Sequence, residues 1–467
     1  MATRPDLTSE QEQHAQALAT RMQARVSETV LEMARTLVAT SDATLFGDTE
    51  FALRDQALGL LGVADTEHLP RKKSGYQGSS IDCPHCRATA AFHGYRERHA
   101  ESLGGRICCR RAYYYCRSCG HGTAPWDPAV GLTERRLTPA VERLATLTGA
   151  VADSFENGAE LLAETSGIRL RESTVERTTA AAGKRIAAVL SGDRGLGKSK
   201  PWAWHCDAWG RTVGYIALDA TGIRPQGRGG VKADGRMAYV GMIFNPLPDR
   251  ERVFEKLPKP GTSMTARYVS GLYPLSAIQP RLAPLGDASR GWIADVQIAL
   301  SDGGAGREDL LRDHFGRVEV VILDFFHAAE HLGKLAKAWH PQDEPAAREQ
   351  TAAWSRLLRD EGGDAMIAVL EEGDIPSSAS ARSIREEVRT YFRNQCHRMD
   401  DPTYEANGWF IGSGAVESAC KTVVGSRLKG SGMRWSESGG DAVCHVRALY
   451  RSEPSQWQAF WQRDLAA

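Results

Sequence analysis

The sequence predicts a multidomain α/β protein, and three observations support this fold class. The 467 residues are enough for about three domains. Apolar, β-rich runs between residues 212 and 323 predict a mixed sheet, and stretches of helical periodicity precede and follow them. Two Cys-x-x-Cys pairs ahead of the sheet predict a small module that is closed by a metal ion.

Charge and hydropathy narrow the class of function. Lys plus Arg and Asp plus Glu each number 58, so the global charge does not point to nucleic acid and any basic surface must be local. The sequence contains no run of eighteen apolar residues, and its start lacks the pattern of a signal peptide. The ten cysteines, four of them in Cys-x-x-Cys pairs, fit a reducing compartment. We therefore expect a cytoplasmic protein with no membrane partner.

Residues 1–67 predict a helical region. The pattern at residues 9–12 is typical of a capping box, and apolar residues then recur at helical spacing from Leu18 to Leu37. Such a stripe packs either on the rest of the chain or on a second copy, in which case the region serves dimerisation.

Residues 81–128 predict a zinc ribbon. Cys83 and Cys86 form one Cys-x-x-Cys pair, and Cys116 and Cys119 form the other. Each pair places two thiolates on a tight knuckle, and two knuckles at the ends of a hairpin close a tetrahedral four-sulfur site that suits structural Zn²⁺.

The segment between the two knuckles is basic, with interleaved tyrosines. A surface of this kind either contacts DNA or is the solvated face of a purely structural ribbon. The candidate DNA contacts in this segment are Arg96, Arg98, Arg110 and Arg111.

Residues 130–191 predict an all-helical domain. A helix from Ala159, a turn at Gly167 and a second helix that opens at Ser173 allow a DNA-binding helix-turn-helix. Helical hairpins with a glycine turn also occur in bundles that never touch DNA, so plain packing is the alternative.

Residues 192–199 match the Walker A pattern, and the run that ends at Asp324 resembles a Walker B strand. A working phosphate loop needs a buried strand before it and a helix directly after it. Here a helical pattern precedes the motif and Lys200-Pro201 follows it. A P-loop ATPase is therefore the less favoured reading.

Acidic residues stand at or near the ends of three predicted strands. Asp219 lies near the end of the run 212–223, Asp302 follows the run 296–300, and Asp324 follows the run 318–323. Carboxylates at strand ends converge on one edge of an α/β sheet. Asp324 competes with Asp302 for a place in this cluster, and it could instead cap the helix that follows it.

A later block, residues 412–435, holds Glu417 among basic residues. Glu417 and Lys421 could form an ordinary i,i+4 ion pair on an exposed helix. Alternatively, Glu417 completes a set of three carboxylates with Asp219 and Asp302, which can hold two Mg²⁺ (or Mn²⁺) ions for phosphodiester chemistry. The proposed phosphate contacts around it are Lys421, Arg427, Lys429 and Arg434.

These motifs resemble a prokaryotic insertion-sequence transposase of the Kra-type group, which is related to the Mutator-like transposases. The matching segments are LDATG around Asp219, SDGG at Asp302, the Asp324-x-x-His327 step, and GSGAVESACK with RLKGSGMRW around Glu417. The resemblance runs from the ribbon to the C-terminal tryptophans, and its last block is the most specific. One departure is that Ala-Thr, rather than Gly-Thr, follows the first acid.

The resemblance implies an RNase H-like catalytic core with a DDE triad of Asp219, Asp302 and Glu417, interrupted by an all-helical insertion. It also implies that Asp324 and His327 support the active site. The core would then comprise residues 202–332 and 409–467, with the insertion at 333–408.

The resemblance further implies the partners and the compartment. The expected partner is double-stranded DNA, both as terminal inverted repeats and as target. Because two DNA ends must be paired, a homodimer or higher homo-oligomer is expected, associated with a prokaryotic nucleoid. A metal-dependent nuclease or resolvase without strand transfer is the nearest alternative, and a non-catalytic zinc-ribbon DNA-binding regulator is the alternative from a different class.

Overall fold

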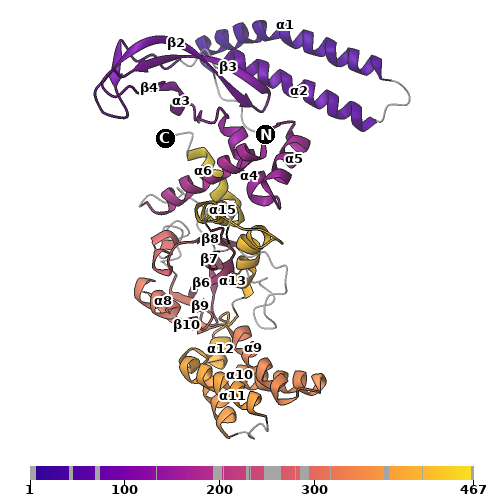
Figure 1. Cartoon of the computed structure of the whole chain (residues 1–467), viewed down its shortest axis with the longest axis vertical. Helices are drawn as coiled ribbons and strands as arrows, with labels where there is room; N and C mark the ends of the chain where they lie inside the picture. Colours follow the sequence, from indigo (N-terminus) through magenta and orange to yellow (C-terminus); the bar gives the residue numbers. More distant parts are fainter. Residues whose placement is uncertain are drawn as a thin grey trace. The chain divides into compact units, whose positions relative to one another are not determined.

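The structure is a computed structural model of the whole chain, drawn in Figure 1. It describes residues 7–40, 46–68, 74–132, 134–192, 202, 204–227, 231, 233–246, 265–278, 280–283, 294–304, 306–315, 317–372, 378–412 and 414–463. The Walker A-like segment lies outside the described residues beyond Gly192, so the ATPase alternative is not addressed by the fold.

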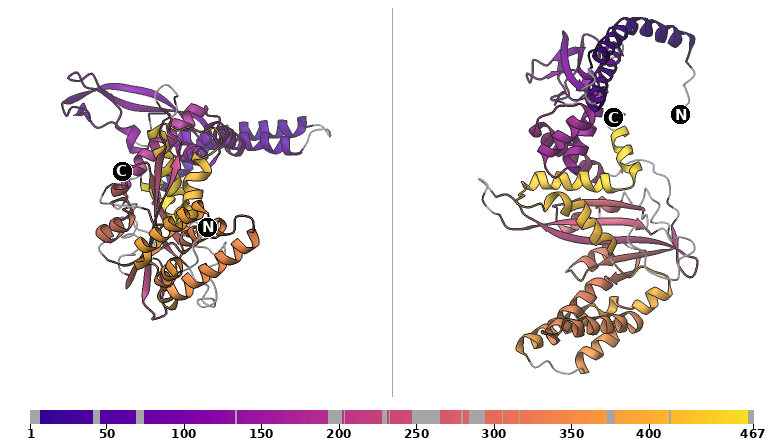
Figure 2. Two further views of the ribbon diagram at one scale, coloured as in Figure 1. Left: turned by 60° about the horizontal axis from the view of Figure 1, so that its bottom comes forward. Right: turned by 90° about the vertical axis from the view of Figure 1, so that its right-hand side faces the viewer.

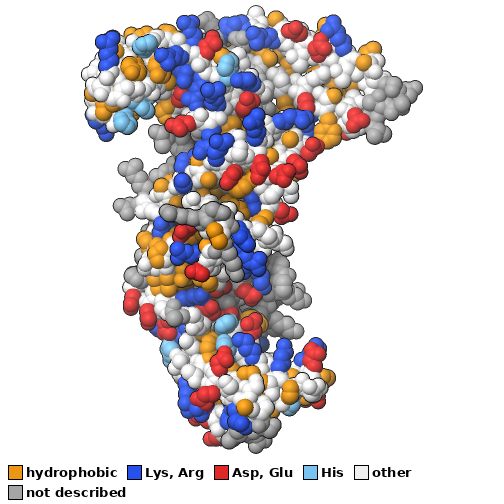
Figure 3. All heavy atoms as spheres, in the orientation of Figure 1, with side chains coloured by type: hydrophobic (Ala, Val, Ile, Leu, Met, Phe, Trp, Pro, Cys, Tyr) orange, Lys and Arg blue, Asp and Glu red, His pale blue; other side chains and the backbone are white. Residues whose placement is uncertain are grey.

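The chain has a mixed α/β fold with two sheets, which agrees with the α/β class that the sequence predicts. It divides into two compact units, residues 1–178 with 461–467 and residues 179–460. On the face drawn in Figure 3, basic and acidic side chains interleave, which agrees with the equal numbers of the two charges.

The first unit begins with two long helices, α1 (Ser9–Ala39) and α2 (Phe46–His68), which lie side by side (Figure 1). The capping box of α1 is made one residue earlier than predicted, because the Thr8 side chain accepts from the Gln11 N–H and the Gln11 side chain accepts from the Thr8 N–H. Every residue of α1 is at least partly exposed.

A four-stranded antiparallel sheet follows, in the order β1-β2-β3-β4. Its strands are β1 (Ser80–Asp82), β2 (Thr89–Ser102), β3 (Gly105–Tyr115) and β4 (Gly122–Thr123). One face of the long β2–β3 hairpin buries Ala100, Ile107 and Cys109 against Trp126 and Leu132, at the short helix α3 (Trp126–Ala129) and just beyond it. The hairpin is therefore anchored on one side and open on the other.

Three helices complete this part of the chain: α4 (Pro139–Val151), α5 (Phe155–Ser166) and α6 (Glu172–Leu190). Ser154 caps the start of α5, and Gly167 ends it with a φ of 70°, which an L side chain rarely adopts. The helix, glycine turn and second helix predicted between residues 159 and 182 are thus present.

The second unit is built on a mixed sheet in the order β10-β9-β6-β7-β8, with the short β5 (His205–Cys206) added to β6. The other strands are β6 (Thr212–Ile223), β7 (Arg236–Asn245), β8 (Thr265–Gly271), β9 (Val296–Ser301) and β10 (Val318–Leu323). The pairs β6–β7 and β7–β8 are antiparallel, whereas β6–β9 and β9–β10 are parallel. The first long strand, β6, therefore lies at the centre, and later strands add on both sides of it.

The helices of the C-terminal region are α13 (Gly414–Ala419), the π-helical turn η6 (Cys420–Gly425), α14 (Ser426–Leu428), α15 (Glu437–Arg451) and α16 (Pro454–Arg463). Of these, α13 and η6 contact β6 and β7, and α15 contacts β8. Helix α15 lies on β8, where the Asp441 carboxylate accepts from the Leu272 N–H at 2.8 Å. Arg267, which is fully buried in β8, pairs with Glu453 beyond the end of α15.

The remaining helices form a separate bundle next to the β10 side of the sheet (Figure 2). They are α9 (Phe325–Trp339), α10 (Glu344–Glu372), α11 (Ala379–Gln395), η5 (Cys396–Arg398) and α12 (Asp401–Ala406), while α8 (Arg307–Phe315) and η3 (Leu275–Ala277) lie earlier in the chain. Trp354 is buried in the bundle core against Trp339, so both rings serve packing.

The residues where the chain enters the bundle and where it returns to the sheet lie next to each other. The Phe325 N–H, at the start of α9, donates to the Ile411 carbonyl at 3.0 Å.

Among the described residues, no helix is both long enough and apolar enough to span a membrane.

Candidate functional site

The parallel strands align three aspartates in a row. Leu218 of β6 pairs with Ser301 of β9, and Ser301 in turn pairs with Leu323 of β10. The next residues along the three strands are Asp219, Asp302 and Asp324. The register therefore places all three at one level of the sheet, at the carboxyl ends of β9 and β10.

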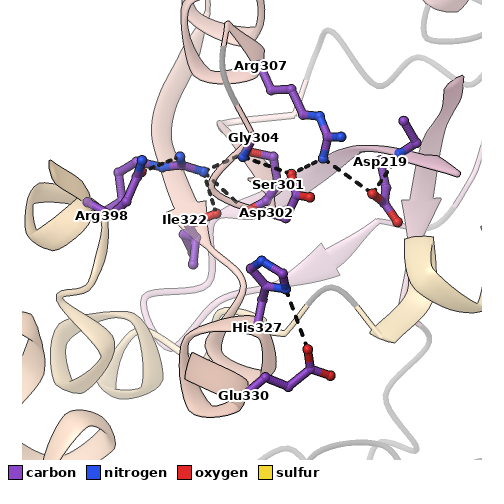
Figure 4. Close-up of polar contacts among 11 residues, drawn as sticks. Asp219, Ser301, Asp302, Gly304, Arg307, Ile322, His327, Glu330 and Arg398 are labelled. Atoms are coloured by element: carbon purple, nitrogen blue, oxygen red, sulfur yellow. Dashed lines mark hydrogen bonds and ion pairs between the residues drawn. The ribbon is translucent and has the colours of Figure 1, made fainter. Parts of the chain in front are cut away.

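One arginine joins the first two of these acids. Nη1 of Arg307, at the start of α8, lies 3.3 Å from Asp219 Oδ1 and also pairs with Asp302 Oδ1, as Figure 4 shows. The Arg307 side chain is only 11% exposed, and those of Asp219 and Asp302 are 20% and 25% exposed. Two carboxylates that share one nitrogen are close enough to share one cation, and their partial exposure leaves the site open to solvent.

Two neighbouring side chains approach the two residues after Asp302 so closely that only glycine fits there. A β-carbon on Gly303 would lie 2.7 Å from the Tyr391 ring, and one on Gly304 would lie 2.8 Å from the Arg307 guanidinium carbon. The Gly304 N–H also donates to Asp302 Oδ1 at 3.1 Å. The Asp-Gly-Gly sequence thus lets Arg307 and Tyr391 close around the loop that carries Asp302.

Arg398 ties together the strand ends beneath this loop. It is 1% exposed, and its Nη2 donates to the Ser301 hydroxyl at 2.7 Å and to the carbonyls of Ser301 and Ile322. Arg398 comes from η5, at the end of the helical bundle, so the bundle helps to fix the register of β9 and β10 at the site.

Asp324 caps the helix that follows it. Its Oδ1 accepts from the Phe326 N–H at 3.0 Å, and its side chain is largely buried, as the capping alternative predicts. The cap fixes the start of α9, from which the His327 side chain projects near the Asp302 loop (Figure 4).

Tyr391 connects this histidine to the site. Its ring stacks on His331 with a centroid distance of 4.0 Å and lies 6.2 Å from the His327 ring, while its other contacts cover Gly303. Burial, with a further contribution from His327, lowers the pKa of His331 to about 4, so His331 is neutral at physiological pH. His327 itself has Glu330 as its nearest acid, at 3.8 Å.

Glu417 does not join the two aspartates directly. Its carboxylate pairs with Lys421 Nζ at 2.5 Å on an exposed face, which is the ion pair that the i,i+4 spacing allows. The helix that carries it, α13, nevertheless lies against β6 and β7. One turn later, the Cys420 thiol contacts the Asp219 carboxylate, and burial together with that carboxylate raises the pKa of Cys420. Glu417 is therefore one helical turn away from a residue in contact with Asp219.

The basic residues near Glu417 have different surroundings. Lys429 Nζ donates to the Thr221 hydroxyl at 2.6 Å, which places its charge beside the end of β6, and Arg434 is exposed. Arg427 is only 2% exposed, with its guanidinium 4.8 Å from the centre of the Trp435 ring. Its position makes Arg427 a packing residue of this region, whereas Lys429 and Arg434 reach the surface.

The four cysteines of the predicted zinc site lie together in the first unit, with all four Sγ atoms within 4.8 Å of one another. Sγ of Cys83 lies 3.7 Å from that of Cys119, and Sγ of Cys86 lies 3.6 Å from that of Cys116. A tetrahedral zinc ion with Zn–S bonds of about 2.3 Å requires sulfur separations of about 3.8 Å. These four cysteines, the cysteine cluster, could therefore bind zinc.

The two knuckles of the cysteine cluster have the same backbone form. The residue after each second cysteine, Arg87 in one and Gly120 in the other, has a positive φ of 65° and 69° and donates its N–H to the carbonyl of the first cysteine. The Cys119 N–H is the largest influence that lowers the pKa of Cys116 to about 7. The pKa values of Cys86 and Cys119, in the same cluster, are raised, so the shared backbone form and the sulfur separations carry the assignment.

The four arginines predicted as DNA contacts on the hairpin separate into two pairs. Arg98 and Arg111 turn to the core side and both pair with Asp127, with side chains only 15% and 12% exposed. Arg96 and Arg110 are exposed, with their guanidiniums 3.7 Å from the Tyr113 ring centre and 5.3 Å from that of Tyr95. The prediction for Arg98 and Arg111 did not foresee Asp127, which takes up their charges. Figure 3 shows basic side chains over this part of the surface.

Two arginines of the site were missed in the sequence. Arg307 and Arg398 bind partners 88 and 97 residues away in the chain, Asp219 and Ser301 respectively. The only local signal was an arginine five residues after Asp302, in a segment that the acid pattern already singles out.

No protein-family model matches the chain, and no sequence among curated proteins matches it.

Proposed function

We propose that the protein is a DDE transposase with an RNase H-like core, which hydrolyses DNA at the ends of its element and joins the freed 3′-hydroxyls to target DNA. The observation that carries the proposal is the pair Asp219 and Asp302, aligned on neighbouring parallel strands and sharing one cationic group. The strand order also supports it: three consecutive antiparallel strands are followed by two parallel strands on the other side of the first.

The donor set fits magnesium or manganese. Both ions prefer carboxylate oxygens, and Asp219 and Asp302 already place one oxygen each around a single positive nitrogen. Glu417 would complete the set: its helix packs on β6, and its carboxylate would exchange the Lys421 ion pair for the metal. A bound pair of such ions would supply an activated nucleophile and stabilise the leaving oxygen of a phosphodiester.

The surrounding residues have positioning roles in this proposal. Arg398 fixes the ends of β9 and β10. Asp324 caps the start of α9, the helix that carries His327. Lys421, Lys429 and Arg434 would contact DNA phosphates near the metal-binding carboxylates.

The first unit would bind the terminal inverted repeats. The cysteine cluster, as a zinc ribbon, would stabilise the hairpin that presents Arg96 and Arg110, and the pair α5 and α6 is the candidate helix-turn-helix. Since both element ends must be held at once, the active form would be a homodimer or a higher homo-oligomer.

Cleavage assays with the full-length protein test the proposal. Labelled duplexes that cover the DNA on both sides of the gene are incubated with Mg²⁺ and a supercoiled plasmid, which serves as target. The wild type is expected to nick at defined positions and to yield labelled plasmid. Glu417→Gln is expected to lose both products, whereas Glu344→Gln, which breaks a comparable i,i+4 pair with Arg348 on α10, should keep them.

Each outcome decides between the candidate functions. Defined cleavage without plasmid joining would favour a nuclease or resolvase. Binding without cleavage by the wild type would favour a non-catalytic regulator, and equal cleavage by Glu417→Gln would exclude Glu417 from the triad.

Arg307 is expected to compete with metal ions for the two aspartates. Because its charge occupies the position between them, Arg307→Gln should bind Mn²⁺ at least about tenfold more tightly, which corresponds to about 1.4 kcal/mol. Calorimetric titration with Mn²⁺ measures this directly. Arg348→Gln, which removes an exposed arginine of α10, is the control and should leave the affinity unchanged. Unchanged or weaker Mn²⁺ binding by Arg307→Gln would contradict the expectation.

A further inference from the structure

A second group of metal-ligating side chains lies on the open face of the β2–β3 hairpin, apart from the cysteine cluster. Glu97 and His99 are two residues apart on β2 and so project from the same face of the sheet, and His99 is directly opposite Cys108 of β3 in the register. A carboxylate oxygen, an imidazole nitrogen and the Cys108 Sγ all lie within 4.8 Å of one another. We propose that Glu97, His99 and Cys108 form a binding site for a divalent transition-metal ion of the zinc class, with water as the fourth ligand.

The local charge pattern supports this site. Arg110 is the cross-strand neighbour of Glu97 and would be its natural ion-pair partner. The Arg110 guanidinium lies instead over the Tyr95 ring, at 5.3 Å from its centre. The Glu97 carboxylate is thus grouped with His99 and Cys108, where a cation would balance its charge.

The hairpin also holds the three ligands in place before any metal arrives. Alternate residues of the same two strands, Ala100, Ile107 and Cys109, are buried on the opposite face. Arg98 and Arg111 clamp that face further through Asp127. Because one face is fixed, the backbone positions of the three ligands on the other face keep their mutual distances, which lowers the entropy cost of binding a metal.

The ligand types define the class of ion. One sulfur, one nitrogen and one oxygen suit Zn²⁺, Co²⁺ or Cu²⁺, whereas Mg²⁺ and Ca²⁺ require oxygen ligands. Three protein ligands with one open position differ from the closed four-sulfur arrangement of the cysteine cluster. Binding would convert the Cys108 thiol to a metal-bound thiolate and release its proton to solvent.

Cobalt titration of the full-length protein tests the site. The protein is first loaded with one equivalent of Zn²⁺, which the cysteine cluster retains, and Co²⁺ is then added while the sulfur-to-cobalt charge-transfer absorption is recorded. The wild type is expected to take up one further equivalent with this absorption, and millimolar Mg²⁺ should not displace it. His99→Ala and Cys108→Ser should lose the second equivalent or bind it at least about tenfold more weakly.

Three variants make the result specific. Glu101→Gln removes an acid from the same face of β2, and Cys206→Ser removes an exposed thiol elsewhere, so both should keep the second equivalent. Asp302→Asn should also keep it, which makes the outcome independent of the proposed catalytic centre. A wild type that gives no sulfur-bound cobalt after zinc loading, or a Cys108→Ser variant that binds it equally well, would overturn the proposal.

Discussion

Replacing Asp302 by asparagine is expected to lower the rate of DNA cleavage by at least about a thousandfold. The change removes one of the two carboxylates that Arg307 brings together, and with it a ligand of the proposed metal site, where charge stabilisation contributes several kcal/mol in the transition state. The asparagine oxygen can still accept from the Gly304 N–H, so the loop should keep its shape.

Single-turnover cleavage and DNA binding, measured on the same preparation, check this expectation. Binding should stay within about threefold of the wild type, because the loss concerns charge stabilisation in the transition state rather than phosphate contacts. Asp313→Asn, which neutralises an exposed acid of the neighbouring helix α8, is the matched control and should cleave normally. Cleavage by Asp302→Asn at the rate of the control would remove Asp302 from the proposed triad.

Replacing Cys116 by serine is expected to unfold the end of the four-stranded sheet that carries the two knuckles. The buried group at this end of the sheet consists of Cys83, Ala90, Ala112, Tyr114 and Cys116. Two of these five residues belong to the cysteine cluster, so the apolar core is too small to replace a metal ion. Structural zinc contributes about 10 to 16 kcal/mol of apparent binding energy to small domains of this kind.

Zinc content and hydrogen exchange measure this effect. Cys116→Ser should lose close to one equivalent of zinc per chain, and its amides in β1, β4 and the adjoining ends of β2 and β3 should exchange much faster, whereas Cys206→Ser should change neither. Chelation of zinc from the wild type should give the same exchange pattern. Full protection of β2 and β3 in Cys116→Ser would show that the sheet is stable without the metal.

Local patterns in the sequence predicted the parts of the site that depend on local order. The bounds expected for the strands 212–223 and 318–323 are those of β6 and β10, because β-branched and apolar residues define these runs without help from distant segments. The Cys-x-x-Cys spacing likewise predicted the gathering of the four thiols, since each knuckle is a closed local turn.

The contacts that the sequence did not predict involve residues that are distant from each other in the chain. The sequence alone predicts that Arg98 and Arg111 are surface cations. In the fold both pair with Asp127, which lies on a helix beyond the hairpin. The pairing of Glu417 with Lys421 is a local one, and the i,i+4 spacing already offered it as the alternative to metal binding. The link between Cys420 and Asp219 joins a π-helical turn to the central strand, and a π turn has no periodic signature in sequence.

The hydrogen bond between Phe325 and Ile411 has a consequence for how the chain can vary. It brings the two ends of the helical bundle together, so the bundle is an insertion in the sheet, and the entropy cost of closing such a loop grows only with the logarithm of its length. Helices within the insertion could therefore be lengthened or lost while the sheet keeps its strand order. Arg398 sets the limit, because this residue near the end of the insertion binds the ends of two core strands. The length of the insertion is free to vary, whereas the turn that carries Arg398 is not.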